Sequence, residues 1–250
     1  SALTARALGM KAGIVTAVGK ETPLNALDGI PITSIESPHS TTFENIYTDA
    51  GRAQYLRAQA ARVDLDTVPP LWRNASIIHL APIANEIDSS LPNDFSPALL
   101  GVTPQGWMRH WDSSGRVSRS EWSDSESVLH KANAVVISRE DVNGDHELIE
   151  QMAHQTRMLV VTEGAEGCVL HWNGDRRRFR APDVNEVDAT GAGDVFATAF
   201  FIRLLRTRDP WEAARFATLI ASISVTRVGL GGIPTQAEIE SCLMEVLRTR

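Results

Sequence analysis

The order of apolar and polar residues along the chain predicts alternating strands and helices. Short apolar runs bounded by glycine or proline are typical of strands buried on both faces. Such runs occur at residues 12–18, 77–81, 99–103, 134–138, 158–162 and 168–172. Polar segments with helical spacing separate several of them, so we expect an α/β fold whose mainly parallel sheet is flanked by helices. Ligands then gather at the carboxyl ends of the strands.

Other stretches differ from this repeat. A helix is expected from Ala2 to Leu8, ending at Gly9. Residues 41–48 alternate and are rich in β-formers, which predicts a strand, whereas the polar residues 50–62 suggest a return loop or a short helix. Residues 211–225 are nearly all small or apolar and predict a buried helix, and residues 235–247 predict a capped terminal helix.

One glycine-rich turn carries the clearest chemical signal. Asp188-Ala-Thr-Gly-Ala-Gly-Asp194 precedes the apolar helical pattern of residues 195–202. The first amides of a helix have no partner along the helix, and its positive dipole end favours an anion. A carboxylate beside them can accept a proton from a hydroxyl while the amides stabilise charge on the group under attack. This combination indicates phosphoryl transfer; the alternative is a tight turn with Asp194 as a first-turn cap.

The same string resembles the C-terminal signature of the ribokinase-like (PfkB-type) carbohydrate kinases, Asp-Thr-x-Gly-Ala-Gly-Asp. Ala189 departs from it, because the family usually has threonine there. The resemblance implies that Asp194 is the catalytic base. It also implies that the backbone of Gly191, Ala192 and Gly193 forms an anion hole for the γ-phosphate.

Two further segments fit the nucleotide-binding motifs of that family. Thr162, Gly164 and Gly167 match Thr-x-Gly-x-x-Gly, although alone they are equally typical of a hairpin turn. Ser138 and Asp141 stand where the family often has Asn-x-x-Glu near Mg²⁺ and phosphate. Mg²⁺ takes few carboxylates and keeps several waters, so a contact from Asp141 is one interpretation and a capping aspartate is the other.

The resemblance also implies roles for the rest of the chain. Thr218 is expected at the adenine, and Asp188 with residues 225–229 at a monovalent cation such as K⁺. Strands around residues 30–50 are expected to form a small β lid over the sugar, with an edge strand of the main sheet as the alternative. The lid is also the expected contact between two copies of the chain.

Composition limits the remaining possibilities. At 250 residues and 43% hydrophobic content the chain can form one α/β domain over residues 1–250, although the family's first strand and its sugar-binding aspartate are missing from this sequence. The net charge of −7 argues against nucleic acid as a partner, and the basic run Arg176–Arg178 is expected in a solvated hairpin. Cys168 and Cys242 match no metal or redox spacing, which suggests a reducing cytoplasm. No apolar run reaches 18 residues, so no membrane association is expected.

These observations predict an ATP- and Mg²⁺-dependent kinase that phosphorylates a hydroxyl of a sugar or cyclitol. Two alternatives remain: a nucleoside kinase, and a catalytically inactive protein of the same fold that binds a ligand or regulates a partner. The intact Asp194 and its glycine turn favour the enzyme. Ala189, Ser138 and the missing first strand keep the inactive alternative open.

Overall fold

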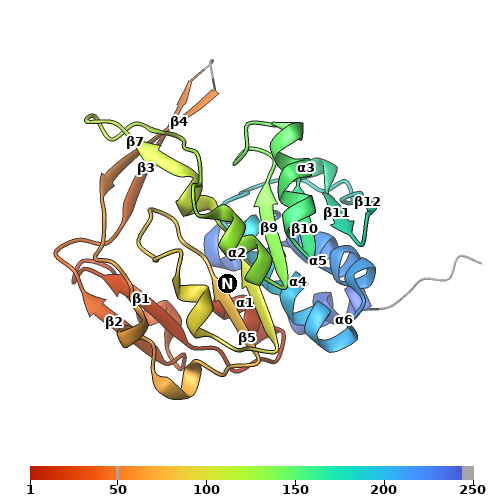
Figure 1. Cartoon of the computed structure of the whole chain (residues 1–250). Coiled ribbons are helices and arrows are strands. Elements are labelled where there is room, and N and C mark those ends of the chain that lie inside the picture. The colour runs from red at the N-terminus through yellow and green to blue at the C-terminus, as the bar shows by residue number, and fades with distance from the viewer. Residues whose placement is uncertain (49–50, 244–250) are drawn as a thin grey trace, which may run out of the picture. The chain divides into compact units, whose positions relative to one another are not determined.

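The structure, a computed structural model, describes residues 1–48 and 51–243. The chain forms two compact units, which are described one at a time (Figure 1). One unit contains Ser1–Ala12 and the chain from Met158 onward, and the other contains Gly13–Arg157. We call them the C-terminal unit and the N-terminal unit.

In the C-terminal unit, three antiparallel strands pack against a layer of helices. The register pairs β10 with β11 and β11 with β12, and α5 packs on β11 and β12. The helices α1, α4, α5 and α6 pack in that order, each against the next. The elements are α1 (Ala2–Ala7), β10 (Met158–Thr162), β11 (Cys168–Trp172), β12 (Asp175–Phe179), α4 (Ala192–Thr207), α5 (Pro210–Ser224) and α6 (Gln236–Leu243).

The hairpin of α4 and α5 is the core of this unit. Both helices are apolar on most faces, as their sequences predict, and Phe200, Phe201 and Phe216 are fully buried between them and their neighbours. The turn between the helices has its own signals. Arg208 ends α4 in a left-handed conformation, and the Asp209 side chain accepts hydrogen bonds from the first amides of α5.

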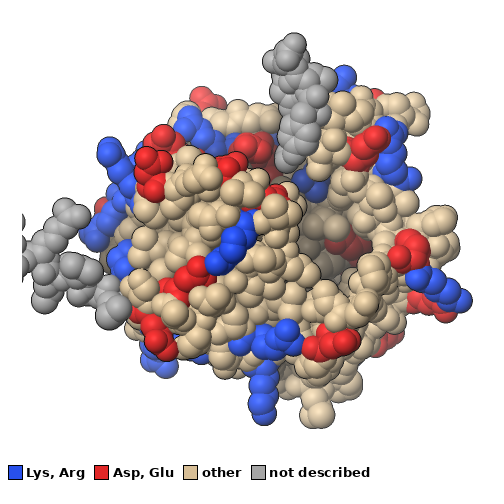
Figure 2. All heavy atoms as spheres, turned by 180° about the vertical axis from the view of Figure 1, so that it is seen from behind, with Lys and Arg blue, Asp and Glu red and all other residues tan. Residues whose placement is uncertain are grey.

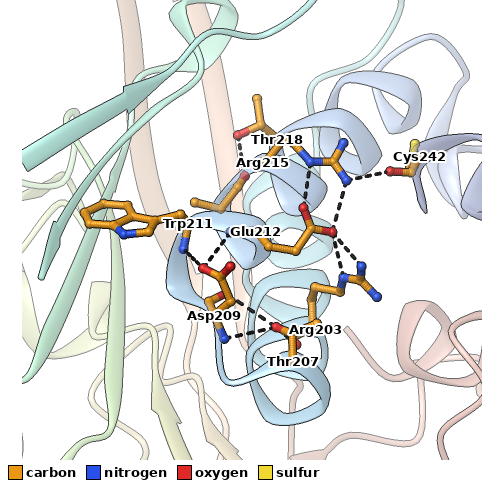
Figure 3. Close-up of polar contacts among 9 residues, drawn as sticks. Arg203, Thr207, Asp209, Trp211, Glu212, Arg215, Thr218 and Cys242 are labelled. Atoms are coloured by element: carbon orange, nitrogen blue, oxygen red, sulfur yellow. Dashed lines mark hydrogen bonds and ion pairs between the residues drawn. The ribbon is translucent and has the colours of Figure 1, made fainter. Parts of the chain in front are cut away.

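A shared carboxylate ties three helices of the unit together (Figure 3). Glu212 on α5 accepts hydrogen bonds from Arg203 on α4, at 2.6 and 2.9 Å, and from Arg215, at 2.7 and 3.0 Å. Arg215 also donates to the carbonyl of Cys242 on α6. Burial opposes ionisation of Glu212, but the two guanidinium groups hold its pKa below the usual range.

In the N-terminal unit, three parallel strands with helical crossovers agree with the predicted α/β class. β6 lies between β5 and β9, and the short α2 and the longer α3 pack together. The predicted strands at 77–81, 99–103 and 134–138 are confirmed. The bounds are β5 (Ile77–Leu80), β6 (Leu99–Val102), α2 (Ser125–Lys131), β9 (Ala134–Ser138) and α3 (His146–Gln155).

The remaining strands of this unit form three separate pairs. β1 (Ile14–Val18) pairs in parallel with β2 (Ile32–Glu36), β3 (Thr42–Thr48) pairs antiparallel with β4 (Gly51–Ala58), and β7 (Arg109–Trp111) pairs antiparallel with β8 (Val117–Arg119). The β3–β4 hairpin is the part of the structure that matches the predicted lid. β2 pairs with β1 instead of joining that hairpin.

Two sequence predictions need correction here. Residues 51–58 are a strand and not a return loop or helix, because pairing with β3 outweighs the helix propensity of their Arg, Ala and Gln residues. The strand near residues 12–18 is half-buried along its whole length instead of buried. Within the described residues it pairs only with β2, so its other edge lacks a neighbouring strand.

Charged side chains of both signs are interspersed over the face drawn in Figure 2. The helices of the described chain are too short or too polar to cross a bilayer. Cys168 and Cys242 are both buried and unpaired, and burial raises the pKa of Cys168 to about 11, so its thiol is protonated at neutral pH.

Replacing Glu212 by Gln should destabilise the protein. The side chain is 22% exposed, and its loss leaves Arg203 and Arg215 facing each other without their shared counter-charge. We expect the free energy of unfolding to fall by about 1–3 kcal/mol. Chemical denaturation followed by circular dichroism measures it, with Glu186→Gln, in an exposed loop, as the control. Equal stability of the two variants would show that the network contributes little.

Candidate active site

The turn before α4 has the geometry expected of the glycine-rich signature. Gly191 is the N-cap of α4 and has φ = 83°, a left-handed conformation that residues with a side chain rarely adopt. It therefore sets the direction in which the helix starts. Gly191, Gly193 and Asp194 are exposed, whereas the helix becomes buried from Val195 onward. The first turn of a buried helix is thus open to a ligand.

Asp194 lies in that first turn with its carboxylate accessible. Its Oδ1 accepts a hydrogen bond of 2.7 Å from the hydroxyl of Ser1, which precedes α1. An alcohol at hydrogen-bond distance from a carboxylate is the arrangement that general-base catalysis on a hydroxyl requires. The position of Asp194 therefore permits the role that the sequence assigned to it.

Asp188 holds the turn from the other side. Its Oδ1 accepts from the amide of Thr190 at 2.9 Å, and its Oδ2 accepts from the amide of Gly229 at 2.8 Å. The Gly229 amide, followed by that of Thr190, keeps the pKa of Asp188 below its usual range. This carboxylate therefore links the glycine turn to the loop before α6. Its contact with a monovalent cation stays a prediction.

The loop that supplies Gly229 is itself anchored to α6. Arg227 donates two hydrogen bonds to the carboxylate of Glu238, at 2.7 and 3.1 Å. Glu238 also accepts from the amide and hydroxyl of Thr235, a capping box at the start of the helix. The Thr-x-x-Glu spacing signalled the cap in advance, but not the ion pair with Arg227.

Only part of the predicted anion hole has amides that could bind an anion in the structure. The Ala192 amide donates to the carbonyl of Ala189 at 3.1 Å, so it closes the turn. Gly193 is an ordinary helical residue, and a Cβ added to it would meet no atom within 4 Å. In a helix that begins at Ala192, the Gly193 amide has no acceptor along the chain. It and the Gly191 amide are the donors left for an anion.

The predicted nucleotide segment forms a tight loop between β10 and β11. Thr162 ends β10, Gly164 has φ = 57° with open space at its Cβ position, and the Glu163 amide donates to the Gly167 carbonyl at 2.8 Å. At position 167, glycine is required by packing within the protein. Its φ is 92°, and an added Cβ would lie 2.0 Å from the carbonyl oxygen of Phe179. Gly164 is therefore the ligand-accessible glycine of the pair.

Thr218 does not expose a group to a ligand in this structure. The residue is 3% exposed, and its hydroxyl donates to the Ala214 carbonyl one turn earlier on α5. The same hydroxyl lies 3.4 Å from the sulfur of Cys168 on β11. Its side chain thus joins α5 to the sheet, and the predicted contact with adenine remains untested.

Ser138 and Asp141 lie at the carboxyl end of β9 in the N-terminal unit. Asp141 Oδ2 accepts from the Ser138 amide at 2.8 Å, and the Ser138 hydroxyl accepts from the Glu140 amide, so the two residues close a turn. Asp141 does not cap a helix, because α3 begins later, at His146. Its Oδ1 accepts from Gln105 at 2.7 Å, a partner that sequence analysis missed. Direct binding of Mg²⁺ by Asp141 stays a prediction.

The loop after β5 is held by many hydrogen bonds at the same edge of the parallel strands. Glu86 accepts from the amides of Ile83 and Ala84, and Arg109 donates to the Ile83 carbonyl. Asn85 adopts a left-handed conformation there, with φ = 55°. The loop borders an open cleft of about 410 Å³. Among the described residues, no group of three or more His, Cys, Asp or Glu side chains could hold a metal ion.

Comparisons with known proteins show which proteins the chain is similar to. A profile of the pfkB family of carbohydrate kinases matches residues 124–236, which include the turn, the loop and α5. Fructokinase of Escherichia coli is 26% identical in an alignment of 269 positions, gaps included, that spans 94% of this chain and 86% of that protein. The chain is thus similar to the pfkB family of carbohydrate kinases over residues 124–236. Ribokinase of Bacillus subtilis is 38% identical over 97 residues, and inositol 3-kinase of Zea mays 26% over 129, covering 32% and 34% of those proteins.

Solved structures confirm the ribokinase-like α/β fold. A pyrophosphate-dependent kinase of the ribokinase family matches with a TM-score of 0.80 and 18% identity, over 97% of this chain and 89% of that one. Ribokinase of Thermotoga maritima matches with a TM-score of 0.73 and 22% identity, over 97% and 84%. The predicted α/β fold class is therefore confirmed.

The anchor of the Gly229 loop should lose its contribution in acid. Hydrogen bonds from Arg227 lower the pKa of Glu238 from 4.5 to about 2, so the ion pair stabilises the fold above pH 4.5 and is lost as the pH falls toward 2. We expect Glu238→Gln to lower the free energy of unfolding at pH 7 by about 1 kcal/mol. The difference from the parent should shrink between pH 4.5 and pH 2.

Denaturation at a series of pH values measures this effect. Glu240→Gln is the matched control on the same helix. Glu240 is exposed, and its carboxylate accepts a hydrogen bond from the neutral side chain of Gln236. A stability difference that does not change with pH would rule out the ion pair as its cause.

Proposed function

We propose that this protein is an ATP-dependent kinase that transfers the γ-phosphoryl group to a hydroxyl of a sugar or cyclitol. Asp194 is the base, the amides of Gly191 and Gly193 stabilise the transferred phosphoryl group, and the loop Thr162–Gly167 binds the donor. Three features support the proposal: the accessible carboxylate at a helix N-terminus, the open space beside its glycines, and the similarity of residues 124–236 to the pfkB family.

Gly193 is the observation that carries the proposal. Glycine favours a helix less than alanine does, by up to about 1 kcal/mol in a helix interior, and Gly193 is the second residue of α4. Nothing within the protein compensates, because the backbone is ordinary and the Cβ position is empty. Close approach of a ligand to the backbone explains the residue. A phosphate is the ligand that suits a helix N-terminus.

Asp194 supplies the proton transfer. Its carboxylate takes the proton of the acceptor hydroxyl as the oxygen attacks the γ-phosphorus, and the bond between that phosphorus and the bridging oxygen of the donor breaks. The hydrogen bond of 2.7 Å from the Ser1 hydroxyl to Oδ1 supports this role, because it shows that the carboxylate is accessible to an alcohol. Positioning and electrostatic stabilisation supply most of the catalysis in this reaction class.

The residues also fit a nucleotide with its metal ion. Val187, Val228 and Leu230 are large apolar side chains exposed next to the residues that Asp188 joins, and such a surface suits the face of a purine ring. Mg²⁺ neutralises phosphate charge in this chemistry. Asp141, whose carboxylate is already hydrogen-bonded on both oxygens, is suited to an Mg²⁺ contact through water. K⁺ near Asp188 is part of the proposal.

A sugar or cyclitol is the favoured acceptor, since relatives are named fructokinase, ribokinase and inositol 3-kinase. The β3–β4 hairpin is proposed as the lid over this substrate and as the contact in a homodimer. A cytoplasmic location fits an enzyme that consumes ATP. Two alternatives remain: a nucleoside as the acceptor, and an inactive protein that still binds a ligand. A screen of acceptors distinguishes both from the proposed sugar or cyclitol kinase.

A screen of sugars, cyclitols and nucleosides for ADP release tests the function directly. The same plates should be run with pyrophosphate in place of ATP, without Mg²⁺, and in sodium, potassium and choline buffers. Turnover should require Mg²⁺, use ATP and increase in potassium. Ligand binding without turnover on any acceptor would favour the inactive alternative.

Gly193→Ala should separate the needs of the fold from those of the ligand. Alanine favours the helix, so the melting temperature should stay the same or rise. The free energy of unfolding should increase by at most about 1 kcal/mol. The added methyl group would face the phosphates, so the Kd for ATP should increase about tenfold or more. Calorimetric titration and thermal unfolding on one preparation measure both. An unchanged Kd would remove Gly193 from the donor site.

Asp194→Asn should separate catalysis from binding. It keeps the size of the side chain but removes the base, so turnover should fall roughly 10²–10⁴-fold. Affinities for ATP and acceptor should change far less, because other residues supply those contacts. Asparagine is also tolerated near a helix N-terminus, so the variant should fold. Near-parental turnover would show that the base is misassigned.

A further inference from the structure

The arginines of β12 place their side chains on opposite faces of the sheet. The guanidinium of Arg177 lies over the ring of Trp211, 4.4 Å from its centroid, and Phe179 stacks on the same ring. Arg178 points to the other face, as strand alternation requires. Its Nη1 lies 2.5 Å from Oε2 of Glu163.

The strand register explains why these two side chains meet. Arg178 is opposite Val169, and Val169 is opposite Val161. Glu163 follows Val161 by two residues and lies just beyond the end of β10, so its side chain falls on the same face as that of Arg178. The Glu163 side chain is 9% exposed and that of Arg178 39%, so the ion pair is largely shielded from water on the carboxylate side.

Glu163 is also the second residue of the proposed donor loop, Thr162–Gly167. Its amide closes the loop by donating to the Gly167 carbonyl, and Gly167 packs beneath the carbonyl of Phe179 on β12. The loop is therefore held by β12 at both ends, through a side chain at Glu163 and through the backbone at Gly167. A displacement of Glu163 would move Gly164, which has open space at its Cβ position.

The charge of Glu163 matters as well as its position. A carboxylate in a loop that binds a polyphosphate would repel it, and the repulsion is strong where water is excluded. Arg178 supplies the compensating charge at direct contact. Removing one partner of a shielded ion pair leaves the other uncompensated, which is worse than removing both.

We propose that Arg178 is a positioning residue for the phosphoryl donor. By pairing with Glu163 it holds the Thr162–Gly167 loop in its binding conformation and offsets a negative charge that would oppose the donor's phosphates. The proposal rests on the assignment of this loop to the donor under the proposed function. It adds a residue from the β11–β12 hairpin, which sequence analysis treated as a solvated arm.

The test compares the Kd for ATP with Mg²⁺, measured by titration calorimetry, across variants of the full chain. Arg178→Met should raise this Kd about tenfold, because the buried carboxylate of Glu163 loses the positive charge of Arg178. Arg178→Lys keeps the charge and should stay within about threefold of the parent. Adding Glu163→Gln to Arg178→Met should recover most of the lost affinity, because it removes the negative charge that Arg178 no longer offsets.

Arg177→Met is the matched control. It removes the neighbouring arginine of the same strand and its contact with Trp211, but it leaves Glu163 paired, so the Kd should not change. Circular dichroism confirms that each variant is folded. If Arg178→Met does not fold, the comparison of Arg178→Lys with the Arg178→Met/Glu163→Gln double variant decides, and both should bind ATP with near-parental affinity.

A Gly164→Val variant distinguishes two ways in which the test can fail: a wrong role for Arg178, and a wrong assignment of the loop to the donor. If Gly164→Val weakens ATP binding and Arg178→Met does not, Arg178 has no positioning role and the inference is wrong. If neither changes the Kd, the loop does not bind the donor, and both assignments fail. If Arg178→Met weakens binding but Glu163→Gln restores nothing, the effect is structural and the charge argument is overturned.

Discussion

Asp188 accepts one hydrogen bond from the amide of Thr190 and another from that of Gly229, 41 residues further along the chain. A carboxylate that accepts backbone amides on both oxygens is held in the ionised form and in one orientation. It fixes the entry to α4 against the loop before α6, which Arg227 and Glu238 hold in turn. The direction of the helix start, and therefore of Asp194, depends on this clamp.

α4 is buried and tightly packed behind the glycine turn, whereas the turn itself is exposed to solvent. From Val195 onward α4 is packed against α1 and α5, and Glu212 links α4, α5 and α6 through two arginines. The first turn contributes little to this core, because Gly193 and Asp194 are exposed. A stable helix can therefore carry a first turn whose residues are chosen for a ligand instead of for stability.

The glycines of the site divide by physical cause. Gly191 and Gly167 are needed by the fold, one for its left-handed backbone and the other because the Phe179 carbonyl occupies the space of a side chain. Gly164 shares the left-handed backbone of Gly191, whereas Gly193 has neither reason. Glycines that the protein does not need for its own packing indicate where a ligand approaches the backbone.

The sequence alone was enough to predict much of this protein. Periodicity identified the strands β5, β6 and β9 and the helices α4 and α5, because burial on fixed faces imposes a local pattern. The signature from Asp188 to Asp194 pointed to the pfkB-type kinases, whose profile matches residues 124–236, because a short motif consists of adjacent residues. Features that depend on neighbours in sequence are visible in the sequence.

Tertiary structure decided the features that join distant segments. β4 is a strand because β3 pairs with it, against its own propensity. Asp141 meets Gln105, and Arg178 meets Glu163, through strand order and register that no local pattern encodes. Thr218, placed at the nucleotide by sequence, is buried against Cys168 because α5 packs on β11. Contacts of this kind depend on which surfaces meet when the chain folds, and only the folded chain specifies them.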